Sequence, residues 1–414
     1  MPHSASAAGR SAPSPRPARG RREPKRAHPD HEVARGLKGV IATETRLSHV
    51  DGERGVLVIG GFPVETLAPH AAFEDVLFLL WHDRVPTADE STHLRRDLAA
   101  SRAMPDAALP LLRAAAARSL PAMDALRMSA ATLSLSDPAP DDPSRSANLA
   151  RAVRAVATFP TLAAAYARLC EGRAPLTPRG DLGHVANYLY MLSGDTPSPN
   201  STRALETYFN TVVDHGMNAS TFAARVIAST RSDLISALVG AVGALKGPLH
   251  GGAPGPALDM VFEIRRRAAA SGRSLAEEAG AWVRETLTHG DRVMGFGHRV
   301  YKVRDPRADV LGEAARDLFV DHRDRALYDD VRAIEGVVVH TLGKLKPGRR
   351  LETNVEFYTA MLLHGVGLPT ELFTPTFALA RAGGWTAHVI EQLDQDQLIR
   401  PESRYVGGWD RTWA

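Results

Sequence analysis

The most informative stretch of the chain is GFGHRVYKVRDPR, at residues 295–307. The two glycines just before His298 predict a flexible loop around it. Asp305 followed by Pro306 is typical of a helix N-cap and first helical residue, which places Arg307 in the first turn of a helix. A loop histidine near such an arginine suits a site that binds a small carboxylate and polarises a carbonyl group beside it.

A second histidine lies in the segment GPLHGGA, at residues 247–253. The stretch before it, residues 234–245, is apolar on nearly every face, and Asp233 can cap it, so it predicts a buried helix. Because a Gly-Pro pair commonly follows a helix C-terminus, we expect His250 in the tight link before the next helix.

The third segment is NVEFY, at residues 354–358. Asn354 can cap a helix whose first turn contains Glu356. The free N–H groups and the macrodipole at a helix start stabilise negative charge by about 0.3–1 kcal/mol. We therefore expect Glu356 to stay ionised, as a general base requires.

Helical signals continue outward from these segments. Residues 73–81 and 146–169 carry apolar residues at helical spacing, and residues 89–98 are polar and helix-prone. A late helix is expected to begin at Thr374-Pro375, to carry Arg381 and to break at the following Gly-Gly pair. These patterns predict a mostly α-helical protein.

Strand signals are confined to residues 36–68, near the start of the chain. Asp51-Gly52 lies there between two short apolar runs, which predicts a small hairpin. Strands do not alternate with helices, so the sequence argues against a doubly wound α/β sheet. The predicted fold class is all-α with a minor β ribbon near the N-terminus.

Composition limits the class of protein further. The chain has 414 residues, 44% of them apolar and 23% charged, which is ordinary for one large or two medium globular domains. No apolar run approaches the roughly 20 residues that span a bilayer, so no membrane is expected as a partner. The one cysteine, Cys170, excludes an intrachain disulfide and is expected to pack as a small apolar side chain.

The high pI of about 9.1 comes from the first 30 residues. They carry seven Arg or Lys against two acidic residues, and this excess of +5 leaves −2 for the rest of a chain whose net charge is +3. We predict that residues 1–32 form a disordered basic tail rich in Pro, Ser and Ala, on a cytoplasmic protein. A nucleic-acid-binding function would rest on this tail alone, and no nucleic acid is expected as a partner.

The histidines lack the spacing of a zinc site, and residues 247–255 lack the Gly-Lys-Ser/Thr of a phosphate-binding loop. No Gly-x-Gly-x-x-Gly follows a predicted strand. These absences disfavour a zinc site, a phosphate-binding loop and a dinucleotide-binding loop.

Together these segments resemble the citrate synthase family, from about residue 36 to residue 407. The three segments described above occur in the order of that family's signature segments. Further matching segments are GLKGV (36–40), SHVDG (48–52), DHGMNAST (214–221), the stretch 373–388, RP (400–401) and YVG (405–407).

The resemblance implies an all-α homodimer with its active site in a cleft between two domains. The large domain would comprise residues 33–251 and 368–414, and the small domain residues 252–367. The implied activity is an acyltransferase of the tricarboxylic acid cycle, which condenses acetyl-CoA with oxaloacetate and hydrolyses citryl-CoA. The resemblance further implies that no metal or redox cofactor is needed, because two neutral or cationic donors stabilise the developing negative charges.

The resemblance also implies a role for each matched residue. His250 would hydrogen-bond the thioester oxygen of acetyl-CoA, and His298 would polarise the ketone of oxaloacetate. Glu356 would remove the acetyl α-proton. Four residues would hold the carboxylates of oxaloacetate: His215, Arg307, Arg381 and, from the other subunit, Arg400.

Two positions depart from the family pattern. Glu356 replaces the usual Asp, and residues 58–62, VIGGF, replace a Tyr-Arg-Gly-Tyr segment. One extra methylene displaces a carboxylate by over about 1 Å unless the backbone compensates, and such an error can cost about a hundredfold in rate. Two alternatives therefore stay open: a 2-methylcitrate synthase that uses propionyl-CoA, and a weakly active sensor that binds CoA or a dicarboxylate.

Overall fold

The computed structural model describes residues 33–250, 254–320, 323–408 and 411–413. The predicted basic tail and most of the glycine-rich segment after His250 lie outside the described residues. The chain divides into two compact units. One unit comprises the two chain ends, residues 1–42 and 400–414, and its described part contains the single 3₁₀ turn η1 (Arg35–Leu37).

The second unit, residues 43–399, is predominantly helical, as predicted. Its α-helices within the described residues are α1 (Val64–Leu67), α2 (Phe73–His82), α3 (Ala88–Ala100), α4 (Ala108–Ala116), α5 (Ala122–Ala130), α6 (Arg145–Cys170), α7 (His184–Ser193), α8 (Pro199–Val212), α9 (Ala219–Ser229), α10 (Leu234–Leu245), α11 (Pro254–Ser271), α12 (Leu275–Thr288), α13 (Pro306–Phe319), α14 (Arg325–Leu345), α15 (Val355–Gly365) and α16 (Phe373–Gln395). Two 3₁₀ helices join them, η2 (Ala131–Ser136) and η3 (Thr370–Leu372). No described helix is both long enough and apolar enough to cross a membrane.

The predicted hairpin is confirmed and belongs to a three-stranded antiparallel sheet. The strands are β1 (Ser48–Asp51), β2 (Val56–Ile59) and β3 (Phe62–Pro63), in the order β1-β2-β3. Ser48 pairs with Ile59, and Asp51 pairs with Val56. Leu57 and Ile59 are fully buried, so apolar packing of β2 holds this small sheet against the helices.

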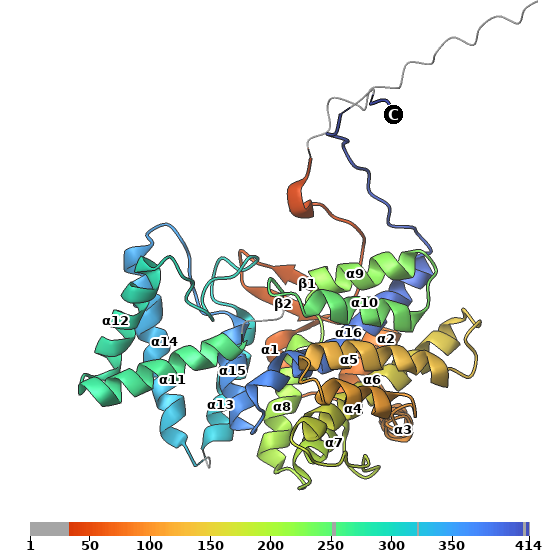
Figure 1. Ribbon diagram of the computed structural model, residues 1–414, viewed down its shortest axis with the longest axis horizontal. Helices are drawn as coiled ribbons and strands as arrows, with labels where there is room; N and C mark the ends of the chain where they lie inside the picture. Colours follow the sequence, from red (N-terminus) through yellow and green to blue (C-terminus); the bar gives the residue numbers. More distant parts are fainter. Residues whose placement is uncertain (1–32, 251–253, 321–322, 409–410, 414) are drawn as a thin grey trace, which may run out of the picture. The chain divides into compact units, whose positions relative to one another are not determined.

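Two groups of helices can be followed in Figure 1. Helices α11 to α15 lie on one side, and α2 to α10 lie on the other, where α16 packs against α6, α8, α9 and α10. Helix α8 also packs against α13 and α15, so it contacts both groups. The boundaries predicted from the sequence for a small domain, residues 252 and 367, stay a prediction.

The predicted break of the late helix at Gly383-Gly384 is wrong, because α16 continues through both glycines to Gln395. A Cβ on Gly383 would lie 2.5 Å from a methyl group of Leu77, and one on Gly384 would overlap the carbonyl oxygen of Val213. These glycines allow two neighbouring segments to approach the helix closely, and they do not end it.

Cys170 also differs from its prediction. It is the last residue of α6 and is exposed, so it does not pack as an apolar side chain.

Candidate active site

His298 lies in the loop between α12 and α13, as predicted. Its Nδ1 accepts hydrogen bonds from the backbone N–H groups of Val300 and Tyr301, each at 3.1 Å. Burial and the nearby Arg307 lower its pKa to about 4, so the ring is neutral at physiological pH. Because Nδ1 is the acceptor, the proton of the neutral ring is on Nε2.

Arg307 is in the first turn of α13, as predicted, and only 3% of its surface is exposed. Its Nε and Nη2 donate to the two oxygens of the fully buried Asp305, at 3.0 and 2.8 Å. Asp305 also caps α13 and accepts a hydrogen bond from the N–H of Val355, which links α13 to α15. The Arg307 Nη2 lies 3.5 Å from the Nε2 of His298, so two donors face the same small volume.

Glu356 is in the first turn of α15, and Asn354 caps that helix by accepting the Glu356 N–H at 3.0 Å. Burial raises the pKa of the Glu356 carboxyl to about 7, although Arg307 and Arg381 act to lower it. At pH 7 about half of these carboxyls are therefore protonated, so the helix N-terminus alone does not keep Glu356 ionised as expected. Desolvation outweighs a macrodipole effect of about 0.3–1 kcal/mol.

His250 follows α10 in a tight turn, as predicted, and its N–H donates to the carbonyl of Gly247 at 2.9 Å. Its Nε2 accepts from the N–H of Ser220 at 3.3 Å and lies 2.9 Å from the Ser220 hydroxyl. The indole N–H of Trp385 donates to the same hydroxyl at 3.1 Å. Burial lowers the pKa of His250 to about 4, so this ring is neutral with its proton on Nδ1.

Arg381 and His215 complete the group of predicted ligand-binding residues in the unit 43–399. Arg381 is buried within α16, and its Nε donates to the carbonyl of Val212 at 2.6 Å. Burial lowers its pKa to about 10, still far above physiological pH. The His215 Nε2 lies 3.1 Å from the Tyr301 hydroxyl, and its ring centroid is 6.0 Å from that of His298.

The structure thus brings His215, His298 and Arg307 together. The charges of Arg307 and Arg381 both act to lower the pKa of Glu356, and the charge of Arg381 also lowers the pKa of His250. The seventh predicted residue, Arg400, is exposed and belongs to the unit of chain ends.

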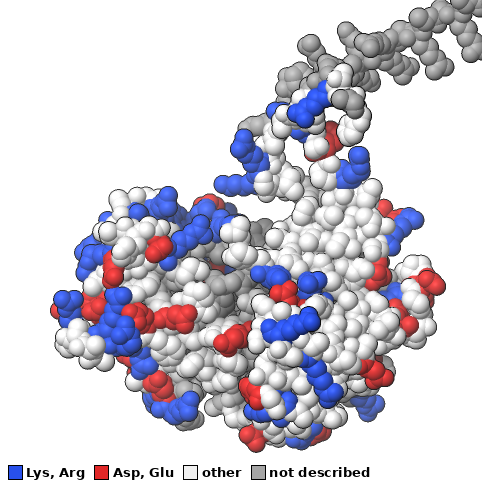
Figure 2. Space-filling model, viewed as in Figure 1, with Lys and Arg blue, Asp and Glu red and all other residues white. Residues whose placement is uncertain are grey.

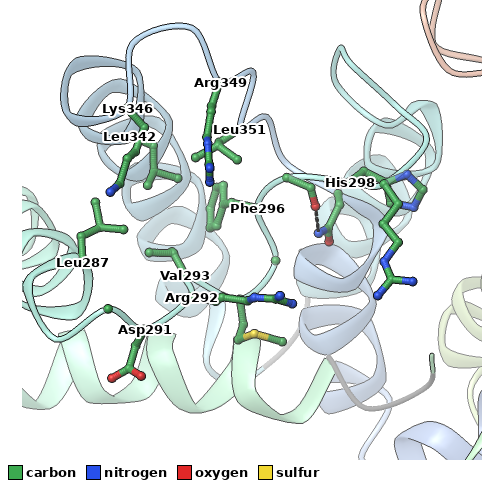
Figure 3. A pocket seen from close by; sticks show the side chains of 16 residues that line it. Leu287, Asp291, Arg292, Val293, Phe296, His298, Leu342, Lys346, Arg349 and Leu351 are labelled. Atoms are coloured by element: carbon green, nitrogen blue, oxygen red, sulfur yellow. Dashed lines mark hydrogen bonds between the residues drawn. The ribbon is translucent and has the colours of Figure 1, made fainter. Parts of the chain in front are cut away.

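A basic pocket of about 660 Å³ adjoins the His298 loop. Figure 3 shows Arg292 and His298 from the segment after α12, and Lys346 and Arg349 from the segment after α14, around the apolar ring of Phe296. In Figure 2, Lys and Arg side chains gather over the top of the α11–α15 group, where the loop after α14 lies in Figure 1. This pocket can receive an anionic ligand with an apolar part.

Several residues of the site were not predicted from the sequence. Ser220 and Tyr301 lie within the quoted segments 214–221 and 295–307, and their membership of these segments was the signal that could have marked them as neighbours of the histidines. The pocket cations Arg292, Lys346 and Arg349 come from two distant segments, and no local pattern marks them.

The arrangement suits one class of chemistry. Two neutral imidazoles can each donate a hydrogen bond to a developing oxyanion, and a carboxylate whose pKa is near 7 can remove a carbon-bound proton. Such a site serves a helical enzyme that joins an enol carbon to a carbonyl carbon. Within the described residues, no cluster of His, Cys, Asp or Glu could hold a metal ion.

Comparison with known proteins identifies the family. A sequence model described as "Citrate synthase, C-terminal domain" matches residues 36–402. The citrate synthase of Haloferax volcanii is 40% identical over 382 residues, which are 92% of this chain and 97% of the relative. The 2-methylcitrate synthase of Mycobacterium tuberculosis (strain H37Rv) is 35% identical over 376 residues, which are 91% of each chain.

Solved structures agree with the sequence comparison. Citrate synthase from Thermotoga maritima superposes with a TM-score of 0.79 at 36% identity, and covers 92% of this chain and 98% of its own. The enzyme from Thermoplasma acidophilum, in a ternary complex with carboxymethyl coenzyme A and oxaloacetate, superposes with a TM-score of 0.81 at 27% identity, with the same coverage. The chain belongs to the citrate synthase family.

Proposed function

We propose that this protein condenses acetyl-CoA with oxaloacetate and hydrolyses the resulting citryl-CoA to citrate and CoA. One observation carries the proposal: two neutral histidines with opposite tautomers share their neighbouring arginines with a carboxylate whose pKa is about 7. The charge of Arg307 acts on both His298 and Glu356, and the charge of Arg381 acts on both His250 and Glu356. Citrate formation would place the protein in the tricarboxylic acid cycle.

In the first step, the ionised Glu356 removes a proton from the acetyl methyl group. The Nδ1–H of His250 donates to the thioester oxygen and stabilises the negative charge that develops there. The enolate carbon then bonds to the ketone carbon of oxaloacetate, while His298 donates a hydrogen bond from Nε2 to the ketone oxygen. That oxygen becomes the hydroxyl of citryl-CoA by taking up one proton, which balances the proton that Glu356 took from the methyl group. Water finally cleaves the thioester, which releases CoA.

Oxaloacetate is held through its two carboxylates. Arg307 and Arg381 are buried cations, and a guanidinium can bind a carboxylate through two parallel hydrogen bonds. His215 is positioned as a further donor beside them. Arg400 would add a contact from the partner subunit of a homodimer, in which each active site is completed across the interface.

The basic pocket beside His298 is proposed as the site of the CoA moiety. Its cations Arg292, Lys346 and Arg349 suit the CoA phosphates, and Phe296 is among its apolar lining residues. The ternary complex of the Thermoplasma acidophilum relative, which holds a CoA analogue and oxaloacetate, supports this substrate pair. No metal or redox cofactor is needed for this chemistry, and the cytoplasmic location stays a prediction.

Propionyl-CoA is the alternative acyl substrate, since a 2-methylcitrate synthase is among the relatives. One methylene is worth only about 1–3 kcal/mol in a pocket. Steady-state kcat/KM values for acetyl-CoA and propionyl-CoA, at saturating oxaloacetate, decide between the two. We expect the larger value for acetyl-CoA, and a clear preference for propionyl-CoA would replace citrate by 2-methylcitrate as the product.

The sensor hypothesis rests on Glu356 in place of Asp. Turnover that collapses in Glu356→Gln rejects the sensor. Turnover that is unchanged in this variant would instead reject Glu356 as the base.

A further inference from the structure

The β1–β2 hairpin contacts both loops that carry the proposed oxaloacetate histidines. One loop, residues 213–218, joins α8 to α9 and carries His215. The other precedes α13 and carries His298. Neither the condensation step nor the carboxylate contacts proposed above use any residue of the hairpin.

The first contact is made by Ser48 at the start of β1. Its Oγ accepts a hydrogen bond of 2.8 Å from the N–H of Gly216. Gly216 has a φ of +56°, a left-handed conformation that favours glycine and gives the chain a sharp turn directly after His215. The hydroxyl of Ser48 is also one of the groups that lower the pKa of the buried Asp214. Ser48 therefore acts on both residues that flank His215.

The second contact is made by the turn of the hairpin. The carbonyl oxygen of Gly52 accepts a hydrogen bond of 2.8 Å from the N–H of Lys302. The two segments lie so close that a Cβ on Gly52 would come within 2.7 Å of the carbonyl carbon of Val300. Since Val300 donates to the Nδ1 of His298, the turn of the hairpin rests against the backbone that orients this ring.

The two loops meet each other where the hairpin holds them. The Nε2 of His215 lies 3.1 Å from the hydroxyl of Tyr301, which is in the loop of His298. The hairpin itself is anchored separately, because Leu57 and Ile59 of β2 are fully buried. Ser48 pairs with Ile59 of β2 as part of the strand ladder, whereas its side-chain hydroxyl contacts the loop of His215.

We propose that Ser48 is a positioning residue for the oxaloacetate site, and that its hydroxyl sets the backbone around Gly216 and thereby the place of His215. This inference rests on the proposed function, in which His215 holds a carboxylate of oxaloacetate. Ser48 does not line the basic pocket proposed for the CoA moiety, so we expect its removal to affect one substrate selectively.

The test compares Ser48→Ala with Ser48→Thr, which keeps the hydroxyl, and with His49→Ala as a matched control. His49 is the next residue of the same strand, and its side chain is exposed. We expect Ser48→Ala to raise the KM for oxaloacetate about fivefold, the effect of losing one hydrogen bond. The KM for acetyl-CoA should stay unchanged, Ser48→Thr should restore the wild-type value, and His49→Ala should behave as wild type.

Two results would overturn the inference. One is an unchanged KM for oxaloacetate in Ser48→Ala. The other is an equal rise of both KM values together with a lowered melting temperature, which would make Ser48 a residue of the fold alone. A wild-type protein without turnover would refute the proposed function instead. In that case, calorimetric binding of oxaloacetate to the wild type and to Ser48→Ala would still decide the role of Ser48.

Discussion

Acidification should slow the reaction through a single group, the carboxyl of Glu356. Its pKa is about 7, whereas the pKa values of His250 and His298 are about 4. Between pH 5 and pH 8 the two histidines therefore stay neutral, and the base alone gains a proton. Because the protonated carboxyl cannot accept the acetyl proton, kcat/KM for acetyl-CoA should follow the ionised fraction of Glu356, with a slope of one on the acid side.

The size of the effect follows from the titration of one group. For a base whose pKa is about 7, the ionised fraction falls about tenfold from pH 8 to pH 6 and about 90-fold from pH 8 to pH 5. The assay is release of the free CoA thiol at saturating oxaloacetate, in buffers of constant ionic strength. Glu356→Asp is the matched variant, since it keeps a carboxylate and hence a one-proton acid limb, at a lower rate.

Three results would contradict an acid limb that comes from Glu356 alone. An acid limb whose midpoint is below about pH 5 would mean that the base is not desolvated as the structure has it. A slope of two would mean that a histidine titrates together with Glu356. If the acid limb of the kcat/KM profile were unchanged in Glu356→Gln, the titrating group would be a residue other than Glu356.

Three further variants probe the surroundings of the base. Glu356→Gln should melt at a higher temperature than wild type at pH 8, because the folded pKa of about 7 exceeds the ordinary 4.5 and the ionised carboxyl therefore destabilises the folded wild type. Calorimetry should show this difference in melting temperature shrinking as the pH falls through 7, and no difference below pH 4.5. Asp305→Asn leaves the buried Arg307 without its counter-ion and should cost about 3–5 kcal/mol of unfolding free energy in denaturant titrations, whereas Asp396→Asn, at an exposed ion pair, should change little. Tyr208→Phe removes a buried hydroxyl that has no hydrogen-bond partner among the described residues, so stability should hold or rise; a loss of turnover would show that the substrates use this hydroxyl.

Local sequence signals predicted much of the fold. Asp233, Asp305 and Asn354 each cap the helix expected of them, because capping depends on a side chain and the next few N–H groups. The Gly383-Gly384 pair was wrongly predicted to end the late helix, because a sequence pattern cannot show tertiary packing. The helix continues through both glycines, and other segments pack tightly against them.

Local signals predicted where several candidate site residues lie along the chain, but they did not predict the electrostatics of the site. Family motifs pointed to His215, His250, His298 and Arg307, which the structure places in three loops and at one helix start. The raised pKa of Glu356 was not predictable from its helix position, because it depends on how much protein surrounds the carboxyl. Partners such as the Asp305 carboxylate that holds Arg307 likewise emerge only in three dimensions.

Citrate formation by this chain and the role of Glu356 as the base can be tested in one experiment. The most direct measurement is mass-spectrometric detection of the product from oxaloacetate and acetyl-CoA, with wild type and Glu356→Gln assayed side by side at pH 8. We expect citrate and an equal amount of free CoA from the wild type, and a rate at least about a hundredfold lower in the variant, because its catalytic base has been removed. Citrate formed at the same rate by both proteins would contradict this expectation, as would a wild type that binds both substrates and forms no citrate.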